Sequence, residues 1–260
     1  MATTSNAGRA HKARPVSQKS RFHSYWENLK SILGALAIFL VLRAFVVEAY
    51  RIPSGSMIPT LLVGDWLFVN KAIYGAHVPL SRASLPAFRD PRRGDVVVFV
   101  SPYQGDEDSA GRDPTPTLVK RLVGTAGDTL YMRKGMLYVN GIAQRQGFGT
   151  NAPNPDMANS IDPLFDWQKK VGLTSSRFGS APAQPTHDDW GPLVVPAGKL
   201  FMMGDSRYNS KDSRYWGFVP RENVRGKPLF VYYSYNADDS DRPLPPLTDI
   251  RWSRIGHWIK

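Results

Sequence analysis

The sequence contains no cysteine and only five histidines. The absence of cysteine excludes a disulfide framework, thiolate-bound zinc and a thiol nucleophile. The histidines, at positions 11, 23, 77, 187 and 257, show neither an HExxH pattern nor another spacing typical of metal ligands. We therefore expect no metal site and no cofactor, and we expect the histidines to lie at the surface instead of acting as catalytic bases.

Signatures of several enzyme classes are also missing. The chain has no GxSxG elbow, no GxxxxGKS/T phosphate loop and no GxGxxG dinucleotide fingerprint. It lacks a recognisable nucleic-acid module, although its net charge is +11. Six Lys/Arg against one Glu in residues 1–30 account for +5 of that charge. Because basic residues beside an apolar span usually set membrane topology, we expect no nucleic-acid binding.

Only one long hydrophobic run is present. SILGALAIFLVLRAFVV, residues 31–47, is apolar except for Ser31 and Arg43. As a helix it extends about 26 Å, at the short end of what crosses a bilayer. Flanking aromatic residues, Trp26 and Tyr50, suit the two membrane interfaces. We predict a disordered basic tail over residues 1–25 and a single transmembrane helix over 26–48, with the N-terminus in the cytoplasm.

Two other interpretations of the run stay open. A cleaved signal peptide has small residues before the cut, which Val47-Glu48-Ala49 fits loosely. Against it, the preceding basic region of about thirty residues is long, and Arg43 interrupts the apolar end. A buried helix of a soluble protein is the second alternative, and the basic tail argues against it.

The rest of the chain has the composition of a β protein. It contains 22 Gly and 21 Pro, and its apolar segments WLFVN, VVVFV and PLFVYYSY are short and strand-like. Asn140-Gly141, between MLYV and IAQ, is a strong hairpin signal. Without helix–strand alternation, we predict a mainly antiparallel β-sheet body over residues 49–143 and 191–260. Residues 144–190, rich in Gly, Asn, Pro, Ser and Asp, are predicted to be an inserted cap or flexible segment.

Two segments carry candidates for nucleophilic chemistry. Pro53-Ser54-Gly55-Ser56-Met57 is a turn in which Pro restricts φ and Gly permits unusual conformations, so a serine can be held rigidly. Lys120 interrupts the apolar strand Leu118 to Val123. If its face of the strand is buried, desolvation lowers the pKa of the amine, and a neutral lysine is a competent base for a serine. Taken singly, a surface turn and an edge-strand lysine explain these residues equally well.

A third segment is the loop GDSRYNSKDSRYWG, residues 204–217. Its Gly, Asp, Asn and Ser content favours a tightly hydrogen-bonded loop. The charged residues that can form ion pairs and hold this loop against the sheet are Asp205, Arg207, Asp212 and Arg214. An elaborate turn without a catalytic role is the alternative.

Together the segments resemble a known family. PSGSM followed by IPTL and GD, then RRGDVVVF, VKRLVGTAGD and GDSRYNSKDSRYWGFVP resemble the successive motifs of bacterial type I signal peptidase. They stand in the family's order after an apolar span. The resemblance covers about residues 30–130 and 194–260 and leaves the intervening insertion unmatched.

The resemblance implies a role for individual residues. The family's nucleophile falls on Ser56 and its general base on Lys120, with an oxyanion hole formed by the Ser56 N–H and the Ser54 hydroxyl. The serine that orients the lysine falls on Ser210, and a structural ion pair falls on Asp212 and Arg214. The S1 and S3 pocket positions fall on Ile52, Pro53, Met57, Leu61 and Val119.

The same resemblance implies a function and a place. It implies a serine endopeptidase of the bacterial inner membrane, with its catalytic domain on the periplasmic face and membrane lipid around its anchor. The expected substrates are signal peptides of exported preproteins, cut after Ala-x-Ala-like sites through an acyl-enzyme. This chain departs from common family patterns in its single span and in Ser206 and Tyr208, which stand where Asn and Asp are frequent.

Two alternative functions remain. Another Ser/Lys protease, such as a self-cleaving repressor, would need a DNA-binding helix-turn-helix where the basic tail and apolar run stand. A non-enzymatic, membrane-anchored β-scaffold that binds exported peptides would explain the anchor and the sheet. That scaffold would leave Ser56, Lys120 and Ser210 without a joint role.

Overall fold

The computed structural model describes residues 19–79, 81, 83–144 and 160–260. Most of the predicted basic tail and the first part of the predicted insertion lie outside these residues. The chain forms two compact units, residues 1–42 and residues 43–260.

An N-terminal helix, α1 (Lys19–Phe45), contains the apolar run. Its segment Tyr25–Phe45, with a mean hydropathy of 1.7, is long and apolar enough to cross a membrane. The helix ends before residue 48, where the sequence predicted its end. Val47 and Glu48 instead belong to strand β1 (Val47–Arg51), which pairs with β2. Hydropathy does not separate the two states, because Val47 is equally apolar in a helix and in a strand.

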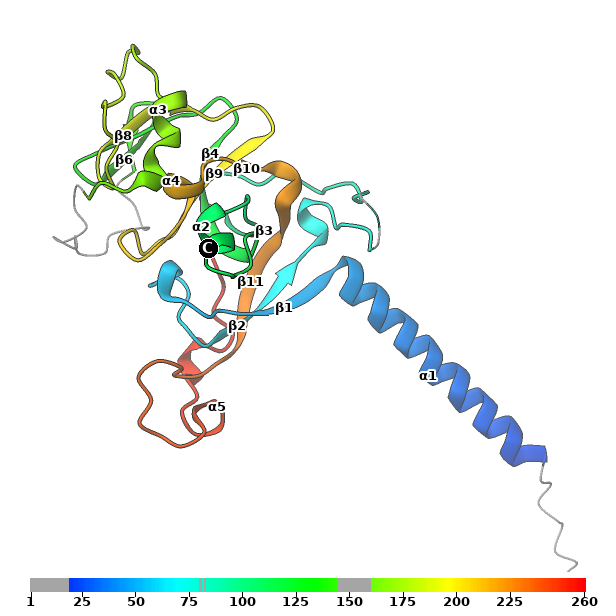
Figure 1. Cartoon of the computed structure of the whole chain (residues 1–260). Coiled ribbons are helices and arrows are strands. Elements are labelled where there is room, and N and C mark those ends of the chain that lie inside the picture. The colour runs from blue at the N-terminus through cyan, green and yellow to red at the C-terminus, as the bar shows by residue number, and fades with distance from the viewer. Residues whose placement is uncertain (1–18, 80, 82, 145–159) are drawn as a thin grey trace, which may run out of the picture. The chain divides into compact units, whose positions relative to one another are not determined.

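The unit of residues 43–260 contains an antiparallel sheet of seven strands (Figure 1). The strand order is β1-β2-β11-β3-β4-β9-β10. Beyond β1, the strands are β2 (Asp65–Asn70), β3 (Val96–Val100), β4 (Thr117–Thr125), β9 (Lys199–Met203), β10 (Val219–Pro220) and β11 (Val224–Ser234). β2 pairs with β11, and β4 pairs with β9, so strands from the N-terminal and C-terminal parts of the chain form one sheet.

A second, four-stranded sheet has the order β7-β6-β5-β8. Its strands are β5 (Thr129–Arg133), β6 (Met136–Val139), β7 (Ile142–Ala143) and β8 (Trp190–Val194). Asn140 and Gly141 form the predicted hairpin turn with φ of 52° and 87°, which a two-residue turn of this kind requires. The predicted mainly antiparallel β fold with one N-terminal helix is therefore confirmed.

Short helices occupy the connections. The α-helical ones are α2 (Gly105–Ser109), α3 (Trp167–Val171), α4 (Ser213–Trp216) and α5 (Pro245–Thr248). The 3₁₀ turns are η1 (Gly55–Met57), η2 (Ala72–Tyr74), η3 (Pro163–Phe165), η4 (Arg221–Asn223) and η5 (Trp252–Arg254).

Both faces of the large sheet are covered at β3. Val96 and Val98 belong to one buried cluster, with Met57 and Leu61, while Val97 and Phe99 belong to another. This explains why β3 is an unbroken apolar run instead of an alternating strand. A strand next to β3 can therefore bury polar side chains on either face.

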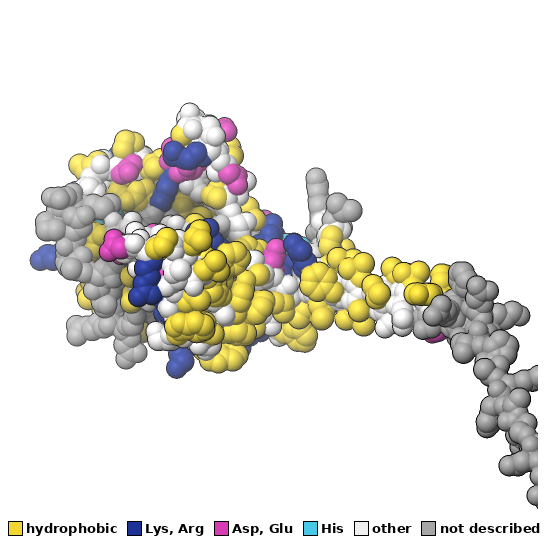
Figure 2. All heavy atoms as spheres, turned by 90° about the horizontal axis from the view of Figure 1, so that it is seen from below, with side chains coloured by type: hydrophobic (Ala, Val, Ile, Leu, Met, Phe, Trp, Pro, Cys, Tyr) yellow, Lys and Arg dark blue, Asp and Glu magenta, His cyan; other side chains and the backbone are white. Residues whose placement is uncertain are grey.

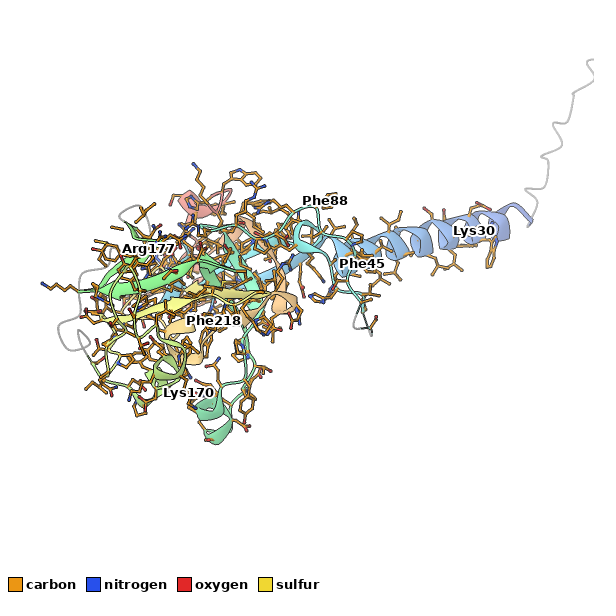
Figure 3. All side chains as sticks on the ribbon, turned by 90° about the horizontal axis from the view of Figure 1, so that it is seen from above. Lys30, Phe45, Phe88, Lys170, Arg177 and Phe218 are labelled. Atoms are coloured by element: carbon orange, nitrogen blue, oxygen red, sulfur yellow. The ribbon has the colours of Figure 1, made fainter. Side chains whose placement is uncertain are left out.

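The described part of the predicted insertion, residues 160–190, packs against the body. Phe165 is fully buried and lies against Tyr215, and the Gln168 side chain donates to the Arg214 carbonyl. Lys170 and Arg177 of this segment, both labelled in Figure 3, are exposed. Residues 160–190 thus pack on the body as an inserted cap would, and the cap or flexible segment predicted over 144–190 stays a prediction. Periodicity did not predict this packing because the buried residues are single positions on short turns and helices, too short to show a repeating buried face.

Candidate active site

Ser56 is the middle residue of the 3₁₀ turn η1. The exposed Ser54 immediately precedes this turn. The turn is closed by a hydrogen bond from the Ile58 N–H to the Gly55 carbonyl, at 3.1 Å. Met57, 2% exposed, anchors the turn in the core beside β3. Buried apolar neighbours therefore hold a partly exposed serine in a fixed position.

Lys120 reaches this serine from β4. The distance from Lys120 Nζ to Ser56 Oγ is 2.5 Å, although 64 residues separate them in the chain. The lysine is only 4% exposed. Burial, and secondarily the nearby charge of Arg214, lower the pKa of Lys120 from 10.5 to about 8, against an opposing effect of Asp212. Its neutral amine is therefore available near neutral pH, as the removal of a proton from Ser56 requires.

The loop that follows β9 packs directly onto the serine. The Ser206 N–H donates to the Ser56 carbonyl at 3.1 Å. A Cβ on Gly204 would lie 2.2 Å from Ser210 Oγ and 2.5 Å from the Ser56 carbonyl oxygen, so the backbone passes where only glycine fits. Ser210 is thereby brought beside the Ser56 backbone.

Asp212 and Arg214 brace this loop in the interior. Arg214 donates from Nε to Asp212 Oδ1 and from Nη2 to Oδ2, both at 2.8 Å, and both side chains are fully buried. Asp212 Oδ2 also accepts from the Ser210 hydroxyl at 2.9 Å and from the Gly204 N–H at 3.0 Å. The charge and hydrogen bonds of Arg214 lower the pKa of Asp212 against the effect of burial. The Asp212 carboxylate therefore stays ionised although both members of the ion pair are fully buried.

A second buried ion pair was missed by the sequence analysis. Arg121 donates to Asp205 from Nε at 2.8 Å and from Nη2 at 2.7 Å. Thr60, four residues after Ser56, donates its hydroxyl to the same carboxylate at 2.6 Å. Asp205 thus pairs with a residue of β4, outside the loop, which the sequence analysis did not name as its partner. The signal was present in the sequence: Arg121 interrupts the same apolar strand as Lys120.

A cavity of about 110 Å³ lies beside the serine and lysine. Ser54, Ser56 and Lys120 line it, together with Tyr50, Arg51, Thr117 and Leu118. Four of the five predicted pocket residues also line it: Ile52, Pro53, Met57 and Val119. The fifth, Leu61, is fully buried in the cluster behind Met57.

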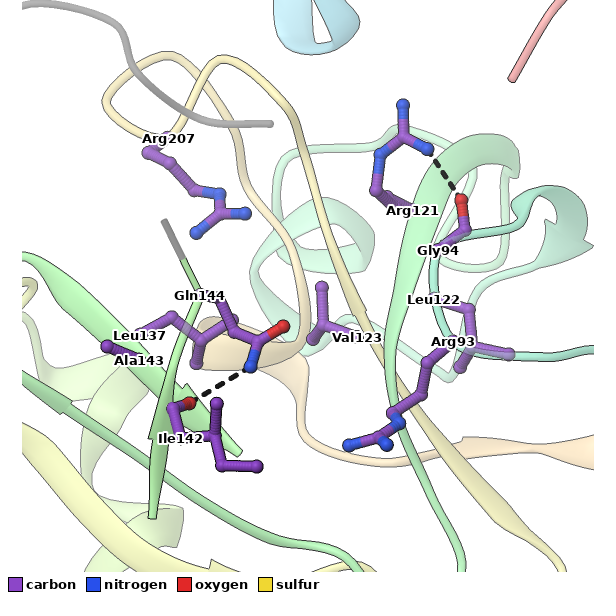
Figure 4. A pocket seen from close by; sticks show the side chains of 10 residues that line it. All are labelled: Arg93, Gly94, Arg121, Leu122, Val123, Leu137, Ile142, Ala143, Gln144 and Arg207. Atoms are coloured by element: carbon purple, nitrogen blue, oxygen red, sulfur yellow. Dashed lines mark hydrogen bonds between the residues drawn. The ribbon is translucent and has the colours of Figure 1, made fainter. Parts of the chain in front are cut away.

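A larger cavity of about 500 Å³ is lined by β4, the β6–β7 hairpin and Arg207 (Figure 4). Neither Ser56 nor Lys120 lines it. Arg121 faces Gly94 at its edge and donates to the Gly94 carbonyl. The serine–lysine site and this cavity are thus different sites.

The structure describes the side chains of three histidines. His257 is exposed and His77 is half-buried, but His187 is only 1% exposed and its ring contacts Asp188 and Arg214. The expected surface location is therefore wrong for His187. Its polar surroundings in the sequence hid the fact that it fills an interior position. Within the described residues, no cluster of three or more His, Cys, Asp or Glu could hold a metal ion.

Comparisons with known proteins identify the family. A family model described as "Signal peptidase, peptidase S26" matches residues 25–233. Signal peptidase I of Pseudomonas fluorescens is 37% identical over 239 residues, which cover 87% of this chain and 77% of that protein. The chain belongs to the signal peptidase I family. Its members are serine endopeptidases that remove signal peptides, and this chain is an enzyme of that class.

More distant relatives carry the same name. Signal peptidase I of Aquifex aeolicus is 31% identical, covering 82% of this chain and 86% of that protein. A crystal structure of a signal peptidase I from Enterococcus faecalis, 28% identical, covers 54% of this chain and 97% of that chain with a TM-score of 0.34. Signal peptidase I homologues are membrane-anchored, and helix α1 is consistent with an anchor.

Proposed function

We propose that this signal peptidase cleaves with a Ser56–Lys120 dyad. The observation that carries the proposal is the 2.5 Å approach of the buried Lys120 Nζ to the partly exposed Ser56 Oγ. Neutral Lys120 takes the proton of the Ser56 hydroxyl as Oγ attacks the scissile carbonyl. The same amine, now protonated, returns that proton to the leaving nitrogen, and the acyl group stays on Ser56.

The second half of the reaction uses the same residues. Lys120 deprotonates a water molecule, the hydroxide adds to the acyl carbon, and Ser56 Oγ leaves with the proton that the lysine took. Charge develops on the carbonyl oxygen in both steps. The Ser56 N–H and the Ser54 hydroxyl serve as its donors, because Ser54 lies beside Ser56 and lines the same cavity.

Ser210, Asp212 and Arg214 position the lysine in this proposal. The Ser210 hydroxyl donates to Asp212. Its oxygen retains lone pairs that can accept from Lys120. Since Arg214 holds Asp212 in place, the position of Ser210 depends on this ion pair.

The cavity supports selection of small side chains. A volume of about 110 Å³ shared between two subsites leaves little room for large residues. In an extended substrate, side chains at −1 and −3 point to the same side of the backbone. An Ala-x-Ala-like sequence before the cut therefore fits a cavity lined by Ile52, Met57 and Val119.

The sequence supports a membrane setting for the reaction. We place the N-terminus in the cytoplasm and the catalytic unit on the outer, periplasmic face, because the basic residues precede the apolar run of α1. Eight residues, 48–55, separate Val47 at the end of the apolar run from Ser56. A substrate held in the same membrane by its own signal peptide is thus close to the serine.

The test is cleavage of a preprotein with an Ala-x-Ala site by the full chain in detergent. We expect Ser56→Ala and Lys120→Ala to lower kcat by at least about 10³-fold, as loss of a nucleophile or its base does. Ser54→Ala is expected to lower kcat by about 10²-fold through loss of one oxyanion donor. Exposed Ser253→Ala and Lys170→Ala are matched controls and should cleave normally.

Three results would overturn parts of this proposal. Normal cleavage by Lys120→Ala would place the base elsewhere. Normal cleavage by Ser56→Ala would exclude the serine as nucleophile. A folded wild-type chain that binds but never cuts the preprotein would favour a peptide-binding scaffold.

A further inference from the structure

His187 belongs to the 160–190 segment, and its buried ring faces the loop after β9. Its Nδ1 is 2.7 Å from Asp188 Oδ1, and its Nε2 is 2.6 Å from Arg214 Nη1. His187 and Arg214 are 1% and 0% exposed, and Asp188 is 6% exposed. The segment that did not match the family motifs thus contributes a buried contact to the ion pair behind the active site.

The protonation state of His187 follows from these partners. Arg214 Nη1 only donates, so His187 Nε2 accepts and carries no proton. The single ring proton then lies on Nδ1 and is donated to Asp188. The second donor nitrogen of Arg214, Nη2, reaches the Arg207 carbonyl at 2.6 Å. The Arg207 carbonyl also lies 3.0 Å from Nε2 and would accept a proton carried there. The shorter contact with Arg214 favours the neutral imidazole with its proton on Nδ1.

Tyr208 holds the same pair from the other side. Its ring stacks on His187 with centroids 4.7 Å apart, and its hydroxyl donates to Asp188 Oδ2 at 3.1 Å. The Gly135 N–H donates to the Asp188 carbonyl, and a Cβ at Gly135 would lie 3.0 Å from the Tyr208 hydroxyl oxygen. Both carboxylate oxygens of Asp188 and the ring plane of His187 are thereby fixed.

We propose that His187 is a positioning residue for cleavage, acting through Arg214. The inference rests on the proposed role of the Ser56–Lys120 dyad. A neutral His187 gives the buried Arg214 guanidinium an acceptor on the side away from Asp212. The oriented Arg214 then holds Asp212, which binds the Ser210 hydroxyl and the Gly204 N–H beside Ser56.

Protonation of His187 should break its contact with Arg214 and loosen the hold of Arg214 on Asp212. An imidazolium has no acceptor for Arg214 and places a second positive charge 2.6 Å from its guanidinium. The charged and titratable groups facing the ring are Arg214, Asp188 and Tyr208, with Asp212 beyond Arg214. Burial and Arg214 lower the pKa of His187, and Asp188 opposes them. The release therefore occurs below the ordinary histidine range near pH ~6.5.

The pH profile of kcat/KM separates this effect from that of Lys120. Activity requires neutral Lys120, so log kcat/KM should rise with a slope of about 1 below pH ~8. At lower pH, where His187 is also protonated, the slope should increase to about 2. Full-chain His187→Gln, whose side-chain oxygen can replace Nε2 as acceptor without titrating, should keep a slope of about 1 throughout.

A second variant measures how much His187 contributes to kcat. His187→Leu leaves Arg214 without this acceptor, and we expect kcat to fall about tenfold with little change in KM. His187→Gln should recover most of that loss near pH 9. His257→Gln, at an exposed histidine, is the matched control and should reproduce both the wild-type rate and the wild-type profile.

Histidine nitrogen NMR on the full chain in detergent tests the geometry without relying on activity. We expect the Nδ1–H tautomer for His187 in the wild type, and Tyr208→Phe should shift its signals because Asp188 loses a donor. An Nε2–H tautomer, an unchanged kcat in His187→Leu, or a second slope in His187→Gln would each overturn the inference. If wild type cuts, Ser56→Ala does not and the His187 variants match wild type, only this inference fails.

Discussion

At the scale of single residues, burial of Lys120 opposes folding whenever its amine is charged. The pKa of Lys120 falls from 10.5 to about 8 in the folded protein, chiefly through burial. Between pH 8 and 10.5 the unfolded chain therefore binds the proton that the native state has released, and stability rises with pH. Below pH 8 Lys120 is protonated in both states. The cost of burying its charge then lowers the free energy of unfolding by the full amount, about 3 kcal/mol.

A substitution that removes the charge should stabilise the protein while abolishing activity. We expect Lys120→Met to raise the free energy of unfolding by about 3 kcal/mol at pH 7, or Tm by roughly 6 to 12 °C. At pH 10 the gain should shrink to below about 1 kcal/mol, because native Lys120 is then neutral. Thermal unfolding in detergent at both pH values measures this, with exposed Lys170→Met as the control. An equal gain at both pH values would show that apolar packing, rather than charge, is responsible.

Residue types near the site were predictable, but their partners were not. The sequence indicated that Lys120 interrupts an apolar strand, and the structure buries it. Arg121, the next residue, interrupts the strand equally and is 1% exposed. Its pairing with Asp205 could not be predicted, because 84 residues separate the two and local pattern carries no information on that distance.

At the scale of elements, strand β4 and the loop after β9 together assemble the site. β4 contributes Lys120 and Arg121 to opposite faces of a sheet that is covered on both sides. The loop contributes Ser210 and Asp212, and at Gly204 its backbone passes so close to Ser56 that a Cβ would not fit. The geometry of the site therefore depends on how tightly two backbone segments pack.

Gly204→Ala tests this close approach. The added Cβ would lie 2.2 Å from Ser210 Oγ and 2.5 Å from a backbone oxygen that moves only with the Ser56 turn. We expect a loss of stability of about 1 to 3 kcal/mol and a fall in kcat of at least about tenfold. Gly105→Ala is the matched control, since its Cβ meets only Tyr103 at 3.7 Å. Wild-type cleavage by Gly204→Ala would mean that the loop can move away from Ser56 without consequence.

Elements with clear patterns were predicted well, and those without patterns were not. The strand VVVFV is β3, and MLYV with Asn140-Gly141 is a hairpin. The segment 160–190, in contrast, packs through isolated residues such as Phe165 and His187. Since no regular face is buried there, periodicity gave no signal, and the contact with Arg214 remained hidden.

At the scale of the whole molecule, the catalytic unit has an exposed apolar surface of its own. Figure 2 shows hydrophobic side chains gathered on the face of this unit seen from below. The exposed residues of the C-terminal segment are Leu244, Leu247, Trp252, Ile255 and Trp258. Basic residues Arg251, Arg254 and Lys260 lie between or after them in the sequence. Tryptophan beside basic residues is typical of a membrane interface, so we propose that this segment contacts lipid.

Binding to lipid vesicles tests this contact apart from the anchor. We expect fragment 43–260, which forms its own compact unit, to bind vesicles containing anionic lipid and to cleave a soluble peptide. Trp252→Ser should weaken vesicle binding about tenfold, because a side chain that is 73% exposed loses its burial in the membrane. Ile142→Ser, at a 69% exposed residue of the four-stranded sheet, is the control. Equal binding by both variants would contradict a lipid contact at Trp252.

The sequence by itself determined the local properties of this protein: an apolar helix at the front, short antiparallel strands, and a serine turn, a strand lysine and a polar loop in a recognisable order. Such properties follow from hydrophobic pattern and turn chemistry, which act over a few residues. Only the tertiary structure decided which polar and charged groups meet. Lys120 reaches Ser56 across 64 positions, and Arg214 reaches His187 across 27. Buried ionic groups need partners, but the packing of distant segments chooses among several candidates of the right charge.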